Sequence, residues 1–138
     1  MFATIHPLAI ILAGLASMPI GMLWYGPLFG KTWAKLMGFS TASMDDSKKK
    51  MRATYAAQLT GTVVQAFVLS LMIFSSRVFE LGQVMLLAFW LWLGFMATVI
   101  MTKQLFDTRP FNRHLYAIDA FYQLVVLEVM AIIIYLFL

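Results

Sequence analysis

The sequence predicts an all-α integral membrane protein in which four transmembrane helices form an antiparallel bundle. Hydrophobic residues make up 62% of the chain and charged residues only 12%, which is too few to cover the surface of a soluble globule. The mean hydropathy of +0.86 agrees, and four long apolar runs divide the 138 residues. We therefore expect a single transmembrane domain, residues 1–138, with the lipid bilayer as its partner.

These apolar runs predict four spans, at about residues 7–28, 53–75, 82–102 and 115–137. Each run can cross the roughly 30 Å of hydrocarbon at about 1.5 Å per residue. The first three contain no Asp, Glu, Lys or Arg, whereas the fourth carries Asp119 and Glu128. Because no Lys or Arg precedes the first run and it is long enough to span, we expect a retained helix rather than a cleaved signal peptide.

The basic residues predict the orientation of the chain. All Lys and Arg residues except Arg77 fall in the loops at 29–52 and 103–114. Cytoplasmic loops are enriched in Lys and Arg, so we expect both loops in the cytoplasm and both termini outside. So uneven a distribution predicts one orientation in the inner (plasma) membrane.

The loops contain further structural signals. Apolar and aromatic side chains at 31–37 lie within a helical turn of one another and stop at Gly38, which predicts a short helix in the membrane interface. Ser43 and Asp46 have the spacing of a capping box, and predict a helix that runs from the loop into the second span. The link around 75–82 is short, so spans two and three should pack as an antiparallel hairpin.

An aromatic stretch, LWYGPLFGKTW at 23–33, joins the first span to the first loop. Trp24 and Tyr25 belong to the residue types that gather among lipid headgroups. Pro27 lacks the amide hydrogen that would continue the helix, and Lys31 can reach a phosphate group. The stretch therefore predicts a structural corner at the membrane surface.

Two further motifs accompany this stretch, LFDTRP at 105–110 and IDAFYQLV at 118–125. Together the three motifs resemble a bacterial membrane-protein family, domain of unknown function 1761, over nearly the whole chain. That family has a WYxPxxFGKxW-like signature, an LFExRP-like turn and an Asn-Ala-x-Tyr-like start to its last helix. The resemblance implies four transmembrane helices in a bacterial inner membrane and no established activity. Asp107 and Asp119 depart from the Glu and Asn of the family pattern.

The motifs also predict a cluster on the cytoplasmic side. Asp107 and Arg109 flank the bend at Pro110, on the same side of the membrane as the aromatic corner. We expect this cluster to join the two basic loops, with Lys31 contacting lipid headgroups or the Asp107 carboxylate. The alternative is helix capping and headgroup contact alone. The candidate members are Trp24, Tyr25, Lys31, Trp33, Asp107 and Arg109.

Polar residues inside the spans form a stripe on span two, from residue 54 to 65, and a patch on span four, from 119 to 123. Amides that face lipid lack hydrogen-bond partners, so both should face protein or water. The candidate residues of a polar pathway, or of contacts between helices, are Gln58, Gln65, Asp119, Tyr122, Gln123 and Glu128.

The two acids of span four are expected on opposite faces of its helix. Asp119 lies near the cytoplasmic end and Glu128 near the middle, nine residues further on. Neither carboxylate should face lipid, where charge is costly. Because no helix of a lone four-helix bundle is surrounded, we expect a homo-oligomer. Glu128 should be neutral, and either titrates along an ion path or donates a hydrogen bond, with Gln65 as a candidate partner.

Several function classes are not expected. The chain has no Cys, and His6 and His114 fall at opposite ends of the membrane. Phosphate-loop, nucleophile and metal-ligand patterns do not occur either, so we expect no enzyme, no cofactor and no metal. The basic residues form no continuous stripe with interleaved aromatics, so nucleic acid is not an expected partner.

Two functions remain open. The first is a small oligomeric channel or transporter in which spans two and four line a path, because carboxylates inside membranes mark ion and proton routes. The second is a non-catalytic subunit or assembly factor of a larger membrane complex. They differ in whether the polar residues enclose water or are satisfied by side chains.

Overall fold

The computed structural model describes residues 5–38 and 51–138. Its helices are α1 (Pro7–Leu23), α2 (Gly30–Met37), α4 (Met51–Ser76), α5 (Leu81–Leu91), α6 (Thr98–Leu105) and α7 (Arg113–Tyr135). Two π-helical turns complete them, η2 (Trp24–Leu28) after α1 and η3 (Trp92–Ala97) between α5 and α6. The capping box predicted at Ser43 and Asp46 lies outside the described residues.

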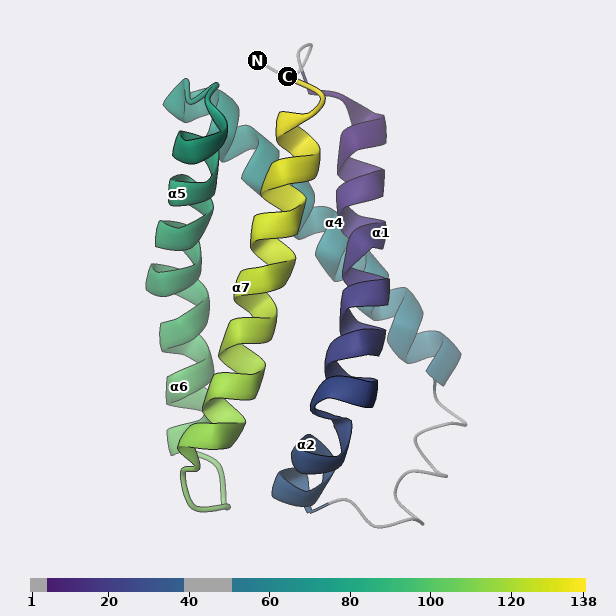
Figure 1. Cartoon of the computed structure of the whole chain (residues 1–138), viewed down its shortest axis with the longest axis vertical. Coiled ribbons are helices and arrows are strands. Elements are labelled where there is room, and N and C mark those ends of the chain that lie inside the picture. Colours follow the sequence, from purple (N-terminus) through teal and green to yellow (C-terminus); the bar gives the residue numbers. More distant parts are fainter. Residues whose placement is uncertain (1–4, 39–50) are drawn as a thin grey trace.

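Four helices of the described chain are long and apolar enough to cross a membrane: Pro7–Leu28, Arg52–Ser76, Leu81–Leu105 and Arg113–Tyr135. The predicted four-helix membrane fold is therefore confirmed. The start of α1 and the end of α7 lie at one end of the bundle, which we call the terminal end (Figure 1). Helix α2 and the loop before α7 lie at the other, which we call the α2 end.

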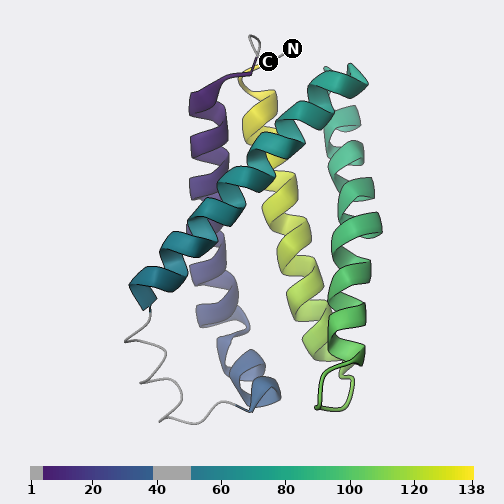
Figure 2. The same cartoon turned by 180° about the vertical axis from the view of Figure 1, so that it is seen from behind.

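Helix α7 is the central element of the bundle. It lies between α1 and the rod formed by α5, η3 and α6 (Figure 1), and it contacts α4 as well. The expectation that no helix of a single chain is surrounded holds for α7 as well, because Phe121 on this helix is 50% exposed. Helix α4 covers one further side of α7, where it crosses the bundle obliquely (Figure 2).

The crossing of α1 and α4 is a close helix contact. A β-carbon on Gly14 would lie 2.7 Å from Val63 Cγ2, and Thr62 Oγ1 donates a hydrogen bond to Gly14 O at 3.2 Å. Small residues allow this backbone approach. Helix α4 contacts α5 only sparsely, and the two helices diverge from their turn (Figure 2). The predicted packing of spans two and three as a hairpin is therefore wrong, because α4 packs mainly against α1.

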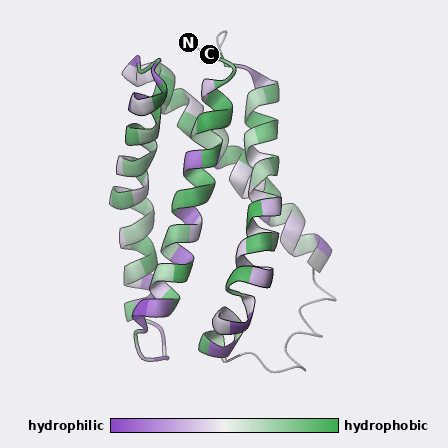
Figure 3. Cartoon of the chain, viewed as in Figure 1, coloured by the Kyte–Doolittle hydropathy of each residue, from purple (hydrophilic) through white to green (hydrophobic). Residues whose placement is uncertain are grey.

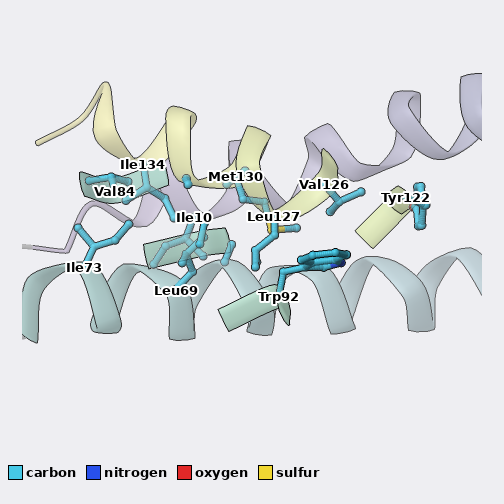
Figure 4. Packing of buried hydrophobic residues seen from close by; sticks show 14 of the residues in the cluster. Ile10, Leu69, Ile73, Val84, Trp92, Tyr122, Val126, Leu127, Met130 and Ile134 are labelled. Atoms are coloured by element: carbon cyan, nitrogen blue, oxygen red, sulfur yellow. The ribbon is translucent and has the colours of Figure 1, made fainter. Parts of the chain in front are cut away.

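The apolar core runs along α7 from Tyr122 to Ile134 (Figure 4) and is most deeply buried toward the terminal end. Its most deeply buried large residues come from α4, α5 and α7: Leu69, Ile73, Val84, Met130 and Ile134. In lipid, van der Waals packing rather than hydrophobic transfer drives helix association, so this interlocked cluster fixes the helices at the terminal end.

The α2 half differs in polarity. Hydrophilic residues gather where α7 begins and on the part of α4 that is farthest from α5, whereas the terminal half is mainly hydrophobic (Figure 3). The candidate site lies in this polar half.

Candidate functional site

The corner after α1 is formed by a π-helical turn and a glycine. Pro27 lies inside η2, where the wider turn accommodates its ring and its missing amide hydrogen. The helix therefore runs through Pro27 to Leu28 instead of ending at the proline as predicted, and α2 begins at Gly30. A β-carbon on Gly30 would lie 2.5 Å from the Tyr25 carbonyl oxygen. The corner therefore requires glycine at this position.

Trp24 and Tyr25 point at α7. Trp24 Nε1 donates to Ile118 O at 2.9 Å, and the Tyr25 hydroxyl donates to Asp119 Oδ1 at 2.8 Å. The Tyr25 ring also meets the ring of Trp33 edge-on, with 5.1 Å between centroids. The interpretation of Trp24 and Tyr25 as interface anchors misses these contacts, because residue type predicts depth in a membrane but not the facing helix.

Asp119 accepts a second hydrogen bond, from Gln104 Nε2 to its Oδ2 at 3.0 Å. A carboxylate only accepts, so the amide nitrogen of Gln104 faces Asp119. Gln104 Oε1 is then buried without a partner in the described part of the chain. Sequence reasoning assigns no role to Gln104, because it follows Lys103 at what looks like the solvated end of span three.

A second tryptophan reaches α7 from the opposite side. Trp92 Nε1 donates to Ala120 O at 2.7 Å, close to the carbonyl that accepts from Trp24. The surrounding residues repeat, as LWYG at 23–26 and LWLG at 91–94, and each motif begins a π-helical turn at its tryptophan. This repeat is the sequence signal by which Trp92 can be found, since hydropathy alone does not single it out.

Arg109 ties the loop before α7 to the end of α2. Its Nη2 donates to Asp107 Oδ2 at 2.6 Å, and its Nη1 donates to Met37 O at 3.1 Å. Hydrogen bonds from Arg109 hold the pKa of the Asp107 carboxyl well below its usual range, and the same bonds raise the pKa of Arg109. Arg109 thus joins the two loops, whereas Lys31 is exposed and forms no ion pair with Asp107 among the described residues.

A partly open pocket of about 880 Å³ lies at the α2 end, between α1, α4, α6 and α7. It brings Asp119 and Gln123, from the predicted patch on span four, together with Gln58, from the predicted stripe on span two. The other polar and aromatic lining residues important for its chemistry are Tyr25, Trp33, Lys103, Gln104, Arg109 and Tyr122.

A smaller pocket of about 480 Å³ continues along α4. Gln58 and Gln123 line both pockets, and Gln65 lines the smaller one. Glu128 lines neither pocket. It is partly buried, and its Oε2 has no hydrogen-bond partner within residues 5–38 and 51–138. The suggested bond between Glu128 and Gln65 is therefore absent, because Gln65 faces the small pocket instead.

Metal-ligating side chains do not converge in the described segments, where no three His, Cys, Asp or Glu could hold an ion together. His6 precedes α1 at the terminal end, and His114 lies in the first turn of α7 at the α2 end. Asp119 is instead surrounded by a phenol and an amide. The groups at the site are therefore suited to hydrogen bonding and to aromatic contact.

Fold and site together define an α-helical membrane protein with four spans and a polar, aromatic-lined pocket at one end. The family model described as protein of unknown function (DUF1761) matches residues 8–135. The chain therefore belongs to the DUF1761 family, as its motifs predict. No curated protein and no solved structure matches the chain.

Proposed function

We propose that the protein is a small transporter-like membrane protein that admits a polar or charged solute to the pocket at the α2 end. The observation that carries this proposal is the 880 Å³ pocket in which polar residues of spans two and four face each other beside Asp119. Small-molecule sites commonly measure roughly 300–1,000 Å³. An acid within a membrane span is costly and is usually kept for a site or an ion path.

The distribution of packing favours a transporter over an open channel. Ile73, Val84 and Met130 are fully buried in the terminal half, beyond the pockets. A channel requires a continuous path across both halves, and this apolar layer interrupts it. A transporter requires a site that is accessible from one side at a time, which matches a pocket confined to one half.

Thiol labelling tests the proposal, because the natural chain contains no Cys. Single substitutions Gln58→Cys and Gln65→Cys place a thiol in each pocket. Ser70→Cys on the same helix is the matched control, since Ser70 is only 2% exposed. In sealed vesicles, an impermeant maleimide added on the α2 side should label Gln58→Cys and leave Ser70→Cys unlabelled.

Other labelling patterns would contradict a transporter. Protection of Gln58→Cys from both sides would favour the non-catalytic subunit or assembly factor, whose polar residues are satisfied by packing. Labelling of Ser70→Cys together with Gln58→Cys from either side would indicate an open channel.

The orientation of the chain is part of the proposal. The α2 end faces the cytoplasm in this arrangement, because the loops there carry nearly all Lys and Arg. Single cysteines in place of Ser76 and Thr108, both exposed, should label from opposite sides of the membrane. Labelling of both from one side would contradict the four-span arrangement.

Homo-oligomerisation remains a prediction. Helix α7 is not fully enclosed by its own chain, since Phe121 is 50% exposed, and Glu128 keeps a buried carboxylate oxygen without a partner in the described residues. A second copy packed at this position would supply a hydrogen bond. Mass measurement in nanodiscs should show an assembly larger than one chain, and a purely monomeric species would contradict it.

A further inference from the structure

We infer that the pocket recognises an organic ammonium cation, whose N–H groups bind Asp119 and Gln104 while aromatic rings and apolar side chains enclose its body. This inference rests on the proposed solute pocket and names the class of ligand that it takes.

The side-chain oxygens of Asp119 and Gln104 can accept more hydrogen bonds than the described chain gives them. Tyr25 and Gln104 each donate one hydrogen bond to the carboxylate, which can accept about four. Gln104 Oε1 is buried and unpartnered among the described residues, and leaving such an acceptor unpaired is costly. A primary ammonium carries three N–H donors and can satisfy both acceptors, whereas a simple carboxylate anion carries none.

Asp119 also forms no salt bridge in the described ranges, and Arg109, which acts on it electrostatically from beyond salt-bridge distance, is paired with Asp107. The ion pair found there joins Arg109 to Asp107, and no Lys, Arg or His of residues 5–38 and 51–138 lies within salt-bridge distance of Asp119. A carboxylate held in a membrane span is stabilised by an opposite charge. A cationic ligand supplies that charge from outside the chain.

The rings of Tyr25, Trp33 and Tyr122 line the pocket together with this carboxylate. Tyr25 meets Tyr122 and Trp33 edge-on, with ring centroids 5.0 and 5.1 Å apart. Aromatic rings attract cations through their electron-rich faces. The adjacent wall is apolar and is formed by Met18, Met22, Ile100 and Leu115. The ligand is therefore an ammonium attached to an apolar body.

Two basic residues line the same pocket and argue for an anion only weakly. Arg109 is already paired with Asp107, and Lys103 is exposed to solvent. A simple carboxylate anion at Lys103 would leave Gln104 Oε1 unsatisfied, because it has no N–H or O–H group to donate. Anion binding is nevertheless an outcome that the experiment can detect.

Calorimetric titration of the full chain in nanodiscs tests the ligand class, with 2-phenylethylammonium chloride as the probe. Saturable binding is expected. The N,N,N-trimethyl analogue keeps the charge and the ring but has no N–H group. It should bind about tenfold more weakly or worse, because hydrogen bonds to a charged group are lost. Benzoate, an aromatic anion, should not bind.

Variants assign the binding to the two acceptors. Asp119→Asn removes the charge at nearly constant shape, and Gln104→Met removes the unpartnered acceptor at similar volume. Each should weaken binding of the primary ammonium by about tenfold. Glu80→Gln removes an exposed carboxylate just before α5, and this matched control should keep the affinity of the natural chain. Circular dichroism verifies that each variant remains helical.

The outcomes separate the ligand class from the proposed function. Equal binding of the primary and trimethyl ammonium ions would overturn the role of the N–H groups, and tighter binding of benzoate would overturn the cation. Unchanged affinity in Asp119→Asn would remove the carboxylate from the site. If Gln58→Cys is labelled but no ammonium ion binds, the pocket stands and its ligand class is wrong. If labelling also fails, the solute pocket itself is wrong.

Discussion

The tetrapeptides LWYG at 23–26 and LWLG at 91–94 begin alike and then lead to different structures. Both start a π-helical turn at the tryptophan, and both indoles donate to carbonyls of α7. After Trp92, which is 7% exposed, the helix continues as α6. After Trp24, which is less buried, the chain turns into α2 and Tyr25 reaches Asp119.

The residues that follow each tryptophan account for this difference. Three aligned pairs differ in chemistry: Tyr25 and Leu93, Pro27 and Phe95, Gly30 and Thr98. Proline and glycine let the first copy leave the helix, and the phenol supplies a donor to the acid. The tryptophan therefore docks a helix on α7 in both copies, and the residues after it decide whether the contact also forms a pocket.

The largest expected effect is on the free energy of unfolding, and it tests whether the two tryptophan motifs contribute equally to packing. Trp92→Ala removes a buried indole and its hydrogen bond, and should lower the free energy of unfolding by about 3 kcal/mol. Trp24→Ala should cost roughly half as much, because Trp24 is only partly buried. Unfolding by a denaturing detergent in mixed micelles, followed by circular dichroism, measures both. Equal losses would mean that the two copies do not differ in their contribution to packing.

The corner after α1 is expected to lose stability when Gly30 gains a side chain. Gly30→Ala would place a β-carbon 2.5 Å from the Tyr25 carbonyl oxygen, and should destabilise the protein by about 1–3 kcal/mol. Gly26→Ala and Gly94→Ala are the controls, since no atom lies within 4 Å of either added carbon. The same micelle assay compares all three. A neutral Gly30→Ala would show that the corner can relax.

A smaller loss of stability is expected from removing the hydroxyl group of Tyr25, which aligns with Leu93 in the second motif. Tyr25→Phe keeps the ring contacts but removes the donor to Asp119, and should cost about 1–2 kcal/mol. Tyr55→Phe is the matched control, because Tyr55 is exposed. A thermal melt in detergent of each variant against the natural chain measures the difference. Similar melting temperatures for both variants would argue against the Tyr25 bond.

The smallest effect concerns the ion pair that fastens the loop before α7 to α2. Arg109 lowers the pKa of folded Asp107, so the pair stabilises the fold fully above the unfolded pKa of about 3.9. Its contribution is lost as pH falls from there through the folded pKa. The stability difference between the natural chain and Asp107→Asn should thus be constant from pH 7 to about pH 5 and shrink below pH 4. A difference that grew with acid would contradict this, and its size is modest because the pair is partly exposed.

The spans and the family could be predicted because both depend on residue type over long stretches. The partners of each helix could not. A helix that is apolar on all sides gives little periodic signal for the face it buries, so the crossing at Gly14 and the separation of α4 from α5 were beyond the sequence pattern. The predicted polar residues of spans two and four do line the pockets, apart from Glu128. Gln104 was missed because only a contact distinguishes it from any polar residue at the end of a helix.

The close contact of Gly14 with Val63 is a point about which α4 would pivot if its crossing angle changed. From Thr62, at the crossing, to Thr54, at the pocket, the lever arm is about 12 Å of helix. A rotation of α4 by about 10° about this contact would move Thr54 by about 2 Å and Gln58 by about half as much. The opposite arm would move in the other direction, past an α5 that it barely contacts. The width of the pocket therefore depends on the crossing angle between α4 and α1.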